Sequence, residues 1–244
     1  MGKLYENIGL RYDIRTKLMS DFKLPNTLRK GFCLVRRSTD YRHYKEYYKN
    51  YKRLEELHNK HKGERCFVVG MGPSLDKTKF DLIKDEHFIV SNSFYVGMDK
   101  FKVKPEYWVV ADDAVWDVHY KQLLSLDTTL FLTEDASRIF LNNKKHYMKN
   151  AKIEPIVIKP LGCSTTWMKL SKDLTKGAYG GMVICSSLQI AFYLGFKEVY
   201  LLGCDCSKKA GSHFKGATHI DKIGDMKFSY KSVFDRRRIK NIFK

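Results

Sequence analysis

Short apolar runs separated by polar segments recur through the middle of the chain. Most of them hold only four or five residues, which is too short for a helix and typical of buried strands. They cover residues 66–69, 88–92, 107–111, 129–133, 156–158 and 199–202. Helical patterns lie between them, at residues 76–84, 115–124, 136–147 and 182–194. This alternation predicts an α/β domain with a mostly parallel sheet and helices on both faces.

The N-terminal part differs from the rest because it is polar, basic and rich in tyrosine. Tyrosines and apolar residues recur at helical spacing from Tyr44 to Leu54 without Gly or Pro, which predicts a helix over residues 39–61. We therefore divide the chain into a basic helical extension, residues 1–62, and an α/β domain, residues 63–244. The stripe of tyrosine and leucine either packs on that domain or contacts an anionic membrane surface or nucleic acid.

The composition indicates a folded domain with an anionic partner. Hydrophobic residues make up 43% of the 244 residues, which supplies a core and excludes global disorder. The formal net charge of +18 favours nucleotides, nucleic acid, acidic glycans or anionic lipids as partners, without choosing among them. No apolar run approaches the roughly 20 residues of a membrane span, and the start of the chain is too polar for a secretory signal. A reducing, cytoplasmic setting is the simplest expectation.

The cysteines predict core thiols rather than a metal site. Cys66 and Cys185 lie in apolar segments, where a thiol behaves as a small hydrophobic group. Cys204 and Cys206 could form half of a metal site, but no second Cys or His pair follows at a matching spacing. We therefore predict no metal site from the sequence.

A glycine-containing turn follows the first predicted strand, residues 66–69, and includes Gly70, Gly72, Pro73 and Ser74. Nucleotides often bind after the first strand of a parallel sheet, because glycines let the backbone approach a phosphate and the next helix offers N–H groups. The turn lacks the third glycine of a dinucleotide fingerprint and the lysine of a Walker loop. A tight strand-to-helix turn without a ligand is therefore the alternative.

Polar residues at predicted strand ends form a second group of candidates, because ligands of open α/β sheets bind at the carboxyl edge. Asn92, Asp112 and Asp205 each lie at such an end. A carboxylate there can hold a metal ion, orient a ribose hydroxyl, act as a base or cap the next helix. Asp113 is the expected N-cap of the helix over residues 115–124.

Gly180 and Gly181 introduce the most apolar predicted helix, residues 182–194, and Gly195 is expected to end it. The N–H groups at the start of this helix offer a second place for an anion. The preceding segment, residues 160–180, lacks clear periodicity. We expect it to be a functional loop that folds over a substrate.

Three ordered motifs carry a resemblance to known families. They are Gly-Met-Gly-Pro-Ser-Leu at 70–75, Ser-Asn-Ser-Phe-Tyr at 91–95 and Leu-Gly-Phe-Lys-Glu-Val-Tyr-Leu-Leu-Gly-Cys-Asp at 194–205. Over residues 65–214 the chain resembles the Rossmann-like family named after 6-hydroxymethylpterin pyrophosphokinase, many of whose bacterial members belong to cell-surface polysaccharide pathways. It is more distantly similar to the bacterial sialyltransferases of glycosyltransferase family 42.

The resemblance to the sialyltransferases implies nucleotide contacts. Gly70, Gly72, Ser74 and Asn92 match positions that contact the cytidine nucleotide in that family, and Asp112 stands where the family has a third contact, an asparagine. The related families usually continue with another helix and strand. This leaves open whether the α/β domain is naturally short, is cut short at its C-terminal end or is completed by a partner chain.

The resemblance implies a transferase. The leading hypothesis is a glycosyltransferase that uses a nucleotide-activated sugar in the synthesis of a bacterial surface glycan. Its partners would be the donor, which is CMP-linked in the sialyltransferases, and a glycan or lipid-linked acceptor, without a metal cofactor. His213 and His219 are the candidate bases, because the unperturbed pKa of histidine near roughly 6.5 suits deprotonation of a hydroxyl. A solvated basic loop is the alternative for both histidines. Two further possibilities are left open. The protein could associate peripherally with the inner face of an anionic membrane, and it could form a homo-oligomer.

Two other functions compete with this interpretation. The first is a diphosphotransferase that acts from ATP on a hydroxymethylpterin-like alcohol, with Mg²⁺ held by Asp112, Asp113 or Asp205. The second is a nucleic-acid-binding protein that uses the basic helix. The absence of a recognisable RNA- or DNA-binding motif in the sequence argues against the second.

Overall fold

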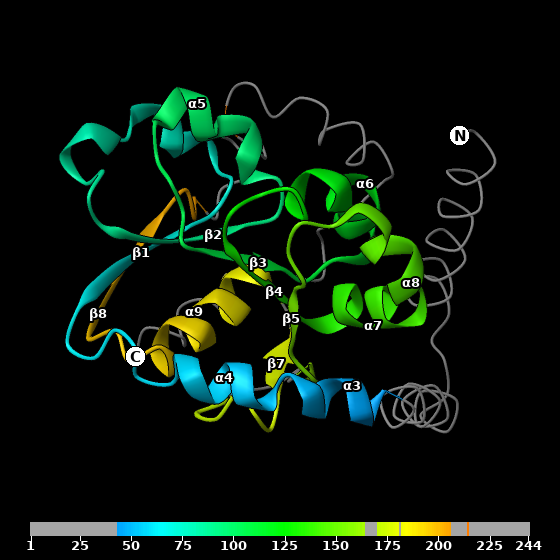
Figure 1. The fold of residues 1–244 in the computed structure, drawn as a ribbon. Coiled ribbons are helices and arrows are strands. Elements are labelled where there is room, and N and C mark those ends of the chain that lie inside the picture. Colours follow the sequence, from blue (N-terminus) through cyan, green and yellow to red (C-terminus); the bar gives the residue numbers. More distant parts are fainter. Residues whose placement is uncertain (1–42, 164–169, 181, 206–213, 215–244) are drawn as a thin grey trace, which may run out of the picture. The chain divides into compact units, whose positions relative to one another are not determined.

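The computed structural model describes residues 43–163, 170–180, 182–205 and 214 (Figure 1). The chain divides into two compact units, Met1–Lys45 and Glu46–Lys244. Apart from the first two residues of α3, Tyr44–Lys49, the helices and strands below belong to the second unit.

Among the described residues, six parallel strands form one sheet in the order β5-β4-β3-β2-β1-β8. They are β1 (Arg65–Val69), β2 (His87–Ser91), β3 (Tyr107–Val110), β4 (Thr129–Leu132), β5 (Ile156–Val157) and β8 (Glu198–Leu202). Each corresponds to an apolar run that predicted a strand, so the α/β, Rossmann-like fold class is confirmed. The strand order reverses at β1, because β2 to β5 follow on one side of it and β8 pairs on the other.

Both faces of the sheet are buried along β1 to β5, whereas the edge strand β8 is partly exposed. This burial explains why these strands are apolar runs and do not alternate with polar residues. In β1, Cys66 and Val68 point into one core cluster, while Phe67 and Val69 point into the other. The same division holds along β2, β3 and β4. Polar groups are therefore confined to the ends of the strands and to the loops beyond them.

Helices cover both faces, as the sequence predicted (Figure 1). One face carries α5 (Met98–Phe101), α6 (Asp113–Leu123), α7 (Glu134–Asn142), α8 (Lys144–Tyr147) and the 3₁₀ turns η1 (Pro73–Lys77), η2 (Phe80–Leu82), η3 (Phe94–Gly97) and η4 (Met148–Asn150). The opposite face carries α4 (Tyr51–Leu57) and α9 (Val183–Tyr193). Within the described ranges, none of the helices has the length and hydropathy that a membrane crossing requires.

The apolar helix α9 and the two predicted core thiols agree with the sequence analysis. Gly195 follows α9 with a φ of +89°, in the left-handed region that glycine adopts at helix ends. Burial raises the pKa of Cys66 to about 12 and that of Cys185 to about 11. Both side chains are therefore protonated at neutral pH and serve as packing groups.

The helix predicted over residues 39–61 is interrupted between α3 and α4. Asn50 lies at the break, and its Nδ2 donates to the Glu46 carbonyl oxygen at 2.8 Å. The side chain thus competes with backbone N–H groups for an acceptor. Leu54 of α4 packs in the core, whereas Tyr48 of α3 is 64% exposed. Only part of the stripe is buried, and contact of the extension with a membrane or nucleic acid stays a prediction.

Two other segments differ from the prediction. Residues 76–84 do not form a helix but the short turns η1 and η2, because the backbone becomes extended at Thr78. The segment at 160–180, expected to be a loop, contains two short parallel strands, β6 (Pro160–Cys163) and β7 (Ala178–Gly180). The helical pattern at 76–84 is misleading, and the segment at 160–180 carries no alternation that would have revealed its strands.

Gln189 of α9 holds the described part of the second segment in place. Its Oε1 accepts hydrogen bonds from Ser171 N at 2.9 Å and from Tyr179 N at 3.0 Å. Its Nε2 donates to the Tyr179 carbonyl oxygen at 2.8 Å. A fully buried amide therefore replaces the hydrogen bonds that a regular ladder would supply.

A half-buried carboxyl group links α6 to α8. The hydroxyl of Tyr147 donates to Asp117 Oδ1. Burial raises the pKa of the Asp117 carboxyl, and the hydrogen bond from Tyr147 opposes this only in part. Because the folded state holds this proton more tightly than the unfolded state, ionisation of Asp117 lowers stability as the pH rises above the unfolded pKa of about 3.9.

We expect Asp117→Asn to be at least as stable as the wild-type protein at pH 7, because it removes a desolvated charge and keeps an oxygen that accepts from Tyr147. The advantage should shrink as the pH falls from 7 to 4. Urea denaturation across this range measures it. Tyr147→Phe is the control, and it should lower stability at pH 7 because it leaves Asp117 without this donor. A clear loss of stability in Asp117→Asn at pH 7 would contradict the assignment.

Candidate functional site

The reversal of strand order between β1 and β8 marks the first part of the candidate site. The strands are parallel, so their carboxyl ends lie at one edge of the sheet. Residues 70–74 follow β1 and residues 203–205 follow β8 at this edge. Ligands of open α/β sheets bind where the strand order reverses. The glycine-containing turn thus lies where the topology favours a ligand.

The N–H groups of this turn have acceptors within the protein. Gly70 and Gly72 both donate to carbonyl oxygens at the end of β8, each at 2.8 Å. Ser74 N, at the start of η1, donates to Asp205 Oδ2 at 2.9 Å. The turn was expected to offer its N–H groups to a phosphate. In the structure these N–H groups donate to carbonyl oxygens and to the Asp205 carboxylate instead.

Close packing between the two loops requires both glycines. A Cβ atom added at Gly70 would lie 2.5 Å from the Gly203 carbonyl oxygen, and one at Gly72 would overlap the Asp205 carboxylate. Pro73 follows as the first residue of η1, where its missing N–H costs no hydrogen bond. The turn and the loop after β8 are therefore one packed unit.

Asn92 follows β2, the neighbour of β1, and carries a buried amide oxygen at this edge. Its φ of +53° lies in the left-handed region, which asparagine tolerates better than most residues. Its side-chain Oδ1 and the hydroxyl of Ser93 are buried and have no hydrogen-bond partner among the described residues. A buried polar atom without a partner costs on the order of 1–3 kcal/mol. A bound molecule that donates a hydrogen bond would recover this cost.

Asp112 is the N-cap of α6, a role that the sequence analysis gave to Asp113. Asp112 Oδ1 accepts from Ala114 N at 2.9 Å and from Val115 N at 3.1 Å. Asp113 is instead the first helical residue, because the backbone of Asp112 is still extended, as a cap requires. Capping explains this carboxylate without a ligand, and its contact with a nucleotide stays a prediction.

Gly180 lies in β7 and not at the start of α9, where we expected an anion. A Cβ atom added at Gly180 would lie 2.5 Å from the carboxyl carbon of Glu134. Glu134 follows β4 with a φ of +48°, and its Oε1 accepts from Ser186 Oγ at 3.4 Å. The Glu134 carboxyl group therefore occupies the space beside Gly180. No motif in the sequence indicated Glu134, because its position depends on the pairing of distant segments.

The carboxylates of this edge could bind Mg²⁺ only if a bound ligand supplied further oxygen atoms. Asp112 follows β3 and Asp205 follows β8, so two strands lie between them. Three strand spacings amount to about 14 Å, which is too far for both residues to bind one ion at Mg–O distances of about 2.1 Å. Either end could hold Mg²⁺ together with phosphate oxygens, as is usual for this ion.

Phe214 connects the chain beyond β8 to the glycine-containing turn. Its N–H donates to the Met71 carbonyl oxygen at 2.8 Å, and its buried ring contacts aromatic residues of η3 and α5. Three of the predicted site residues lie outside the described residues: Gly181, His213 and His219. Their roles stay predictions.

The structure brings only part of the predicted set together. Residues 70–74 contact Asp205 directly, and Asn92 ends the adjacent strand. Asp112 lies at the end of β3, two strands from β1, and Gly180 lies beside the end of β4, three strands away. Sequence reasoning missed Ser93 as a second buried polar group, although it directly follows Asn92.

A comparison with known protein families places the chain in one of them. A family model described as 6-hydroxymethylpterin diphosphokinase MptE-like matches residues 41–211. This range includes the whole six-stranded sheet and the glycine-containing turn. The match confirms the resemblance to the family named after 6-hydroxymethylpterin pyrophosphokinase, and the similarity to the sialyltransferases stays a prediction. A search of curated proteins gives no match.

We expect Asp205→Ala to lower the free energy of unfolding by about 1–3 kcal/mol, the usual cost of leaving a donor without its acceptor, because Ser74 N donates to this carboxylate. Asp205→Asn should cost less, since its amide oxygen can still accept. Urea denaturation measures both. Asp81→Ala, at an exposed aspartate of η2, is the control and should change stability by less than about 0.5 kcal/mol. Equal stability of Asp205→Ala and wild type would show that this bond contributes nothing.

Proposed function

The chain belongs to the 6-hydroxymethylpterin diphosphokinase MptE-like family, and from this premise we propose that it is a glycosyltransferase that uses a nucleotide-activated sugar. The acceptor would be a glycan or a lipid-linked saccharide of a bacterial surface polysaccharide. A CMP-linked sugar is the first donor to test, because the motifs are also similar to those of the family 42 sialyltransferases. The observation that carries the proposal is the buried amide oxygen of Asn92, which has no hydrogen-bond partner in the described part of the chain.

Asn92 suits recognition of the nucleoside part of a donor. Its Oδ1 can accept a hydrogen bond from an exocyclic amino group of a base or from a ribose hydroxyl, and the Ser93 hydroxyl can donate or accept beside it. Both groups are buried at the carboxyl edge, next to the point where the strand order reverses. A few convergent polar groups of this kind fix the orientation of a ligand in sites of this fold class.

The glycine-containing turn favours a sugar donor over a nucleoside triphosphate. Transfer of a diphosphate from ATP requires that the protein hold a chain of phosphates and Mg²⁺ in line with the acceptor. Here three N–H groups of the turn are used internally, and the Asp205 carboxylate lies against it. A donor recognised through its base and ribose needs fewer hydrogen bonds from the N–H groups of this turn. Gly70, Gly72, Pro73 and Ser74 would then form a wall of the donor site.

The proposed reaction needs one base. An acceptor hydroxyl attacks the anomeric carbon of the donor, the bond from this carbon to the phosphate oxygen breaks, and the nucleotide leaves with the bonding electrons. His213 takes the proton of the hydroxyl, with His219 as the second candidate. His213 directly precedes Phe214, whose backbone is hydrogen bonded to Met71 in the turn.

A diphosphotransferase remains the second candidate, since the family description itself names this activity. In that reaction Asp112, Asp113 or Asp205 would hold Mg²⁺ together with the phosphates of ATP. The carboxylates at the ends of β3 and β8 favour it. Dependence on Mg²⁺ separates the two candidates.

A thermal-shift series with CMP, CDP, UDP, GDP, ADP and ATP, each with and without Mg²⁺, tests the proposal. A ligand that binds only the folded state raises the Tm, by an amount equivalent to about 2.7 kcal/mol at a hundredfold excess over Kd. We expect a metal-independent shift with CMP or another sugar-donor nucleotide. A shift confined to Mg²⁺-ATP would support the diphosphotransferase, and no shift with any of the six would contradict both candidates.

Asn92→Gly removes the amide and keeps the left-handed backbone, which alanine would strain. We expect the KM for the donor, or the Kd of the nucleotide that gives the shift, to rise at least tenfold, about 1.4 kcal/mol. Lys102→Gly is a matched control, because Lys102 also has a positive φ, of +52°, and lies at the end of α5. Wild-type donor affinity in Asn92→Gly would refute the role of Asn92.

A further inference from the structure

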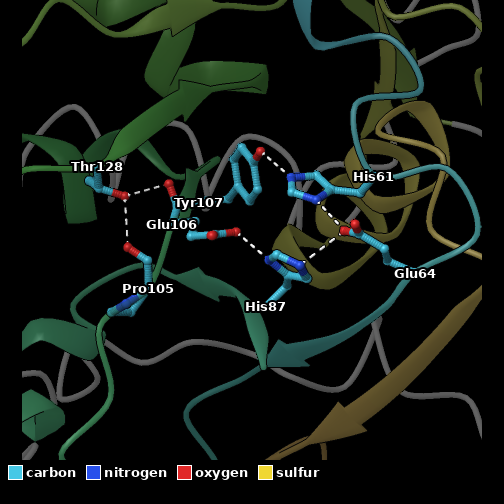
Figure 2. A network of polar contacts seen from close by, with 7 residues as sticks. All are labelled: His61, Glu64, His87, Pro105, Glu106, Tyr107 and Thr128. Carbon is cyan, nitrogen blue, oxygen red and sulfur yellow. Dashed lines mark hydrogen bonds and ion pairs between the residues drawn. The ribbon is translucent and has the colours of Figure 1, made fainter. Parts of the chain in front are cut away.

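Two histidines and two glutamates converge at the edge of the sheet opposite the glycine-containing turn (Figure 2). His61 lies in the turn after α4, Glu64 precedes β1, His87 begins β2 and Glu106 precedes β3. The parallel strands bring their amino ends together here. One donor atom from each of His61, His87 and Glu106 lies within 4.8 Å of the other two.

Glu64 connects the two imidazole rings. Its Oε2 lies 2.6 Å from Nδ1 of His61 and 3.0 Å from Nε2 of His87. One nitrogen of each ring therefore points toward the same carboxylate oxygen, as Figure 2 shows. The Glu64 side chain is 50% exposed, so it has room to rotate and admit an ion between the rings.

The second nitrogen of each ring is held by another polar group. Nε2 of His61 lies 2.6 Å from the Tyr107 hydroxyl, and Nδ1 of His87 lies 2.7 Å from Glu106 Oε2. Histidines that bind metals generally have such a partner on the nitrogen away from the ion, which fixes the ring and its tautomer. The Tyr107 hydroxyl can donate a hydrogen bond to Nε2 of His61.

The surrounding structure fixes His61 in position. Its ring stacks on Phe196 with a centroid distance of 4.6 Å and an interplanar angle of 7°. Its backbone N–H donates to the Leu194 carbonyl oxygen at 2.8 Å. A donor held in this way loses little conformational freedom when it binds an ion.

The carboxylates of the cluster favour a cation. Glu64 and Glu106 each place an oxygen within 3.0 Å of a His87 nitrogen, so a bound divalent ion would lie beside two acidic side chains. A pocket of about 390 Å³ beside Glu64 and His87 gives solvent a route to the cluster.

We propose that His61, Glu64 and His87 form a binding site for a divalent transition-metal ion, with Zn²⁺ as the first candidate and Glu106 orienting the His87 ring. Imidazole nitrogen and carboxylate oxygen are ligands that Zn²⁺ prefers, and these three ligands with a water molecule give its usual coordination number of four. Bound ligand atoms lie about 2.0–2.2 Å from zinc, so the cluster contracts on binding. The ion would join the turn after α4 to the starts of β1 and β2 and stabilise the sheet. The sequence analysis predicted no metal site, because these residues form no recurrent motif.

Zinc titration of the full chain tests this site. The tag-free protein carries Cys204→Ser and Cys206→Ser to remove competing thiolates, is stripped with EDTA, and is titrated with Zn²⁺ against a chromophoric chelator. We expect one Zn²⁺ per chain. His87→Asn and Glu106→Gln should each weaken binding by about 10- to 100-fold or more, whether the residue is a ligand or orients one. His146→Asn is the control, since His146 contacts Tyr120 at a different place in the domain, and it should leave the affinity unchanged.

A second readout separates binding from misfolding. Zn²⁺ should raise the Tm of the parent protein and leave the Tm of His87→Asn and Glu106→Gln nearly unchanged. These two residues are preferred to the buried His61 because their side chains are 29% and 47% exposed, so their loss leaves the core intact. Equal Zn²⁺ affinity in His87→Asn and the parent, or no one-to-one binding by the parent, overturns the proposal.

Discussion

All six described strands of the main sheet run in one direction, and this constraint decides where polar chemistry can occur in the domain. Helices bury both faces of the sheet, so polar side chains collect at its two edges. The carboxyl edge carries the glycine-containing turn, Asn92 and Asp205. The amino edge carries the histidine and glutamate cluster around His61. The two groups are separated by the length of the strands and can act independently.

The carboxyl edge is held together without a ligand. The loops after β1 and β8 interlock through backbone hydrogen bonds and the contact between Ser74 and Asp205. The turn is therefore stable as a structural element, and ligand recognition falls to side chains beside it. Asn92 and Ser93 differ from the turn because their buried polar atoms lack partners among the described residues. The glycine-containing turn and Asp205 therefore maintain the fold, whereas Asn92 and Ser93 are suited to binding.

The sequence predicted the sheet well because each strand is a continuous apolar run, which needs no knowledge of its neighbours. It predicted less well wherever a distant residue decides the local structure. Gln189 orders the segment before α9 through hydrogen bonds that no local pattern encodes. Asp205 was correctly placed at a strand end, but its bond to Ser74 spans 131 residues. The cluster around His61 and His87 is invisible in the sequence for the same reason, since only the parallel register of β1, β2 and β3 creates it.

The pairing of β1 with β8 also sets the order in which the domain can assemble on the ribosome. β2 reaches β1 soon after synthesis, but β8 follows about 130 residues later. At about 5–20 residues per second, this interval is on the order of 10 s. For that time one side of β1 has its backbone N–H and C=O groups unpaired, which is a known risk for aggregation during translation. The arrival of β8 ends this exposure and positions the glycine-containing turn in the same step, so a nascent chain acquires its proposed donor site only when its sheet is complete.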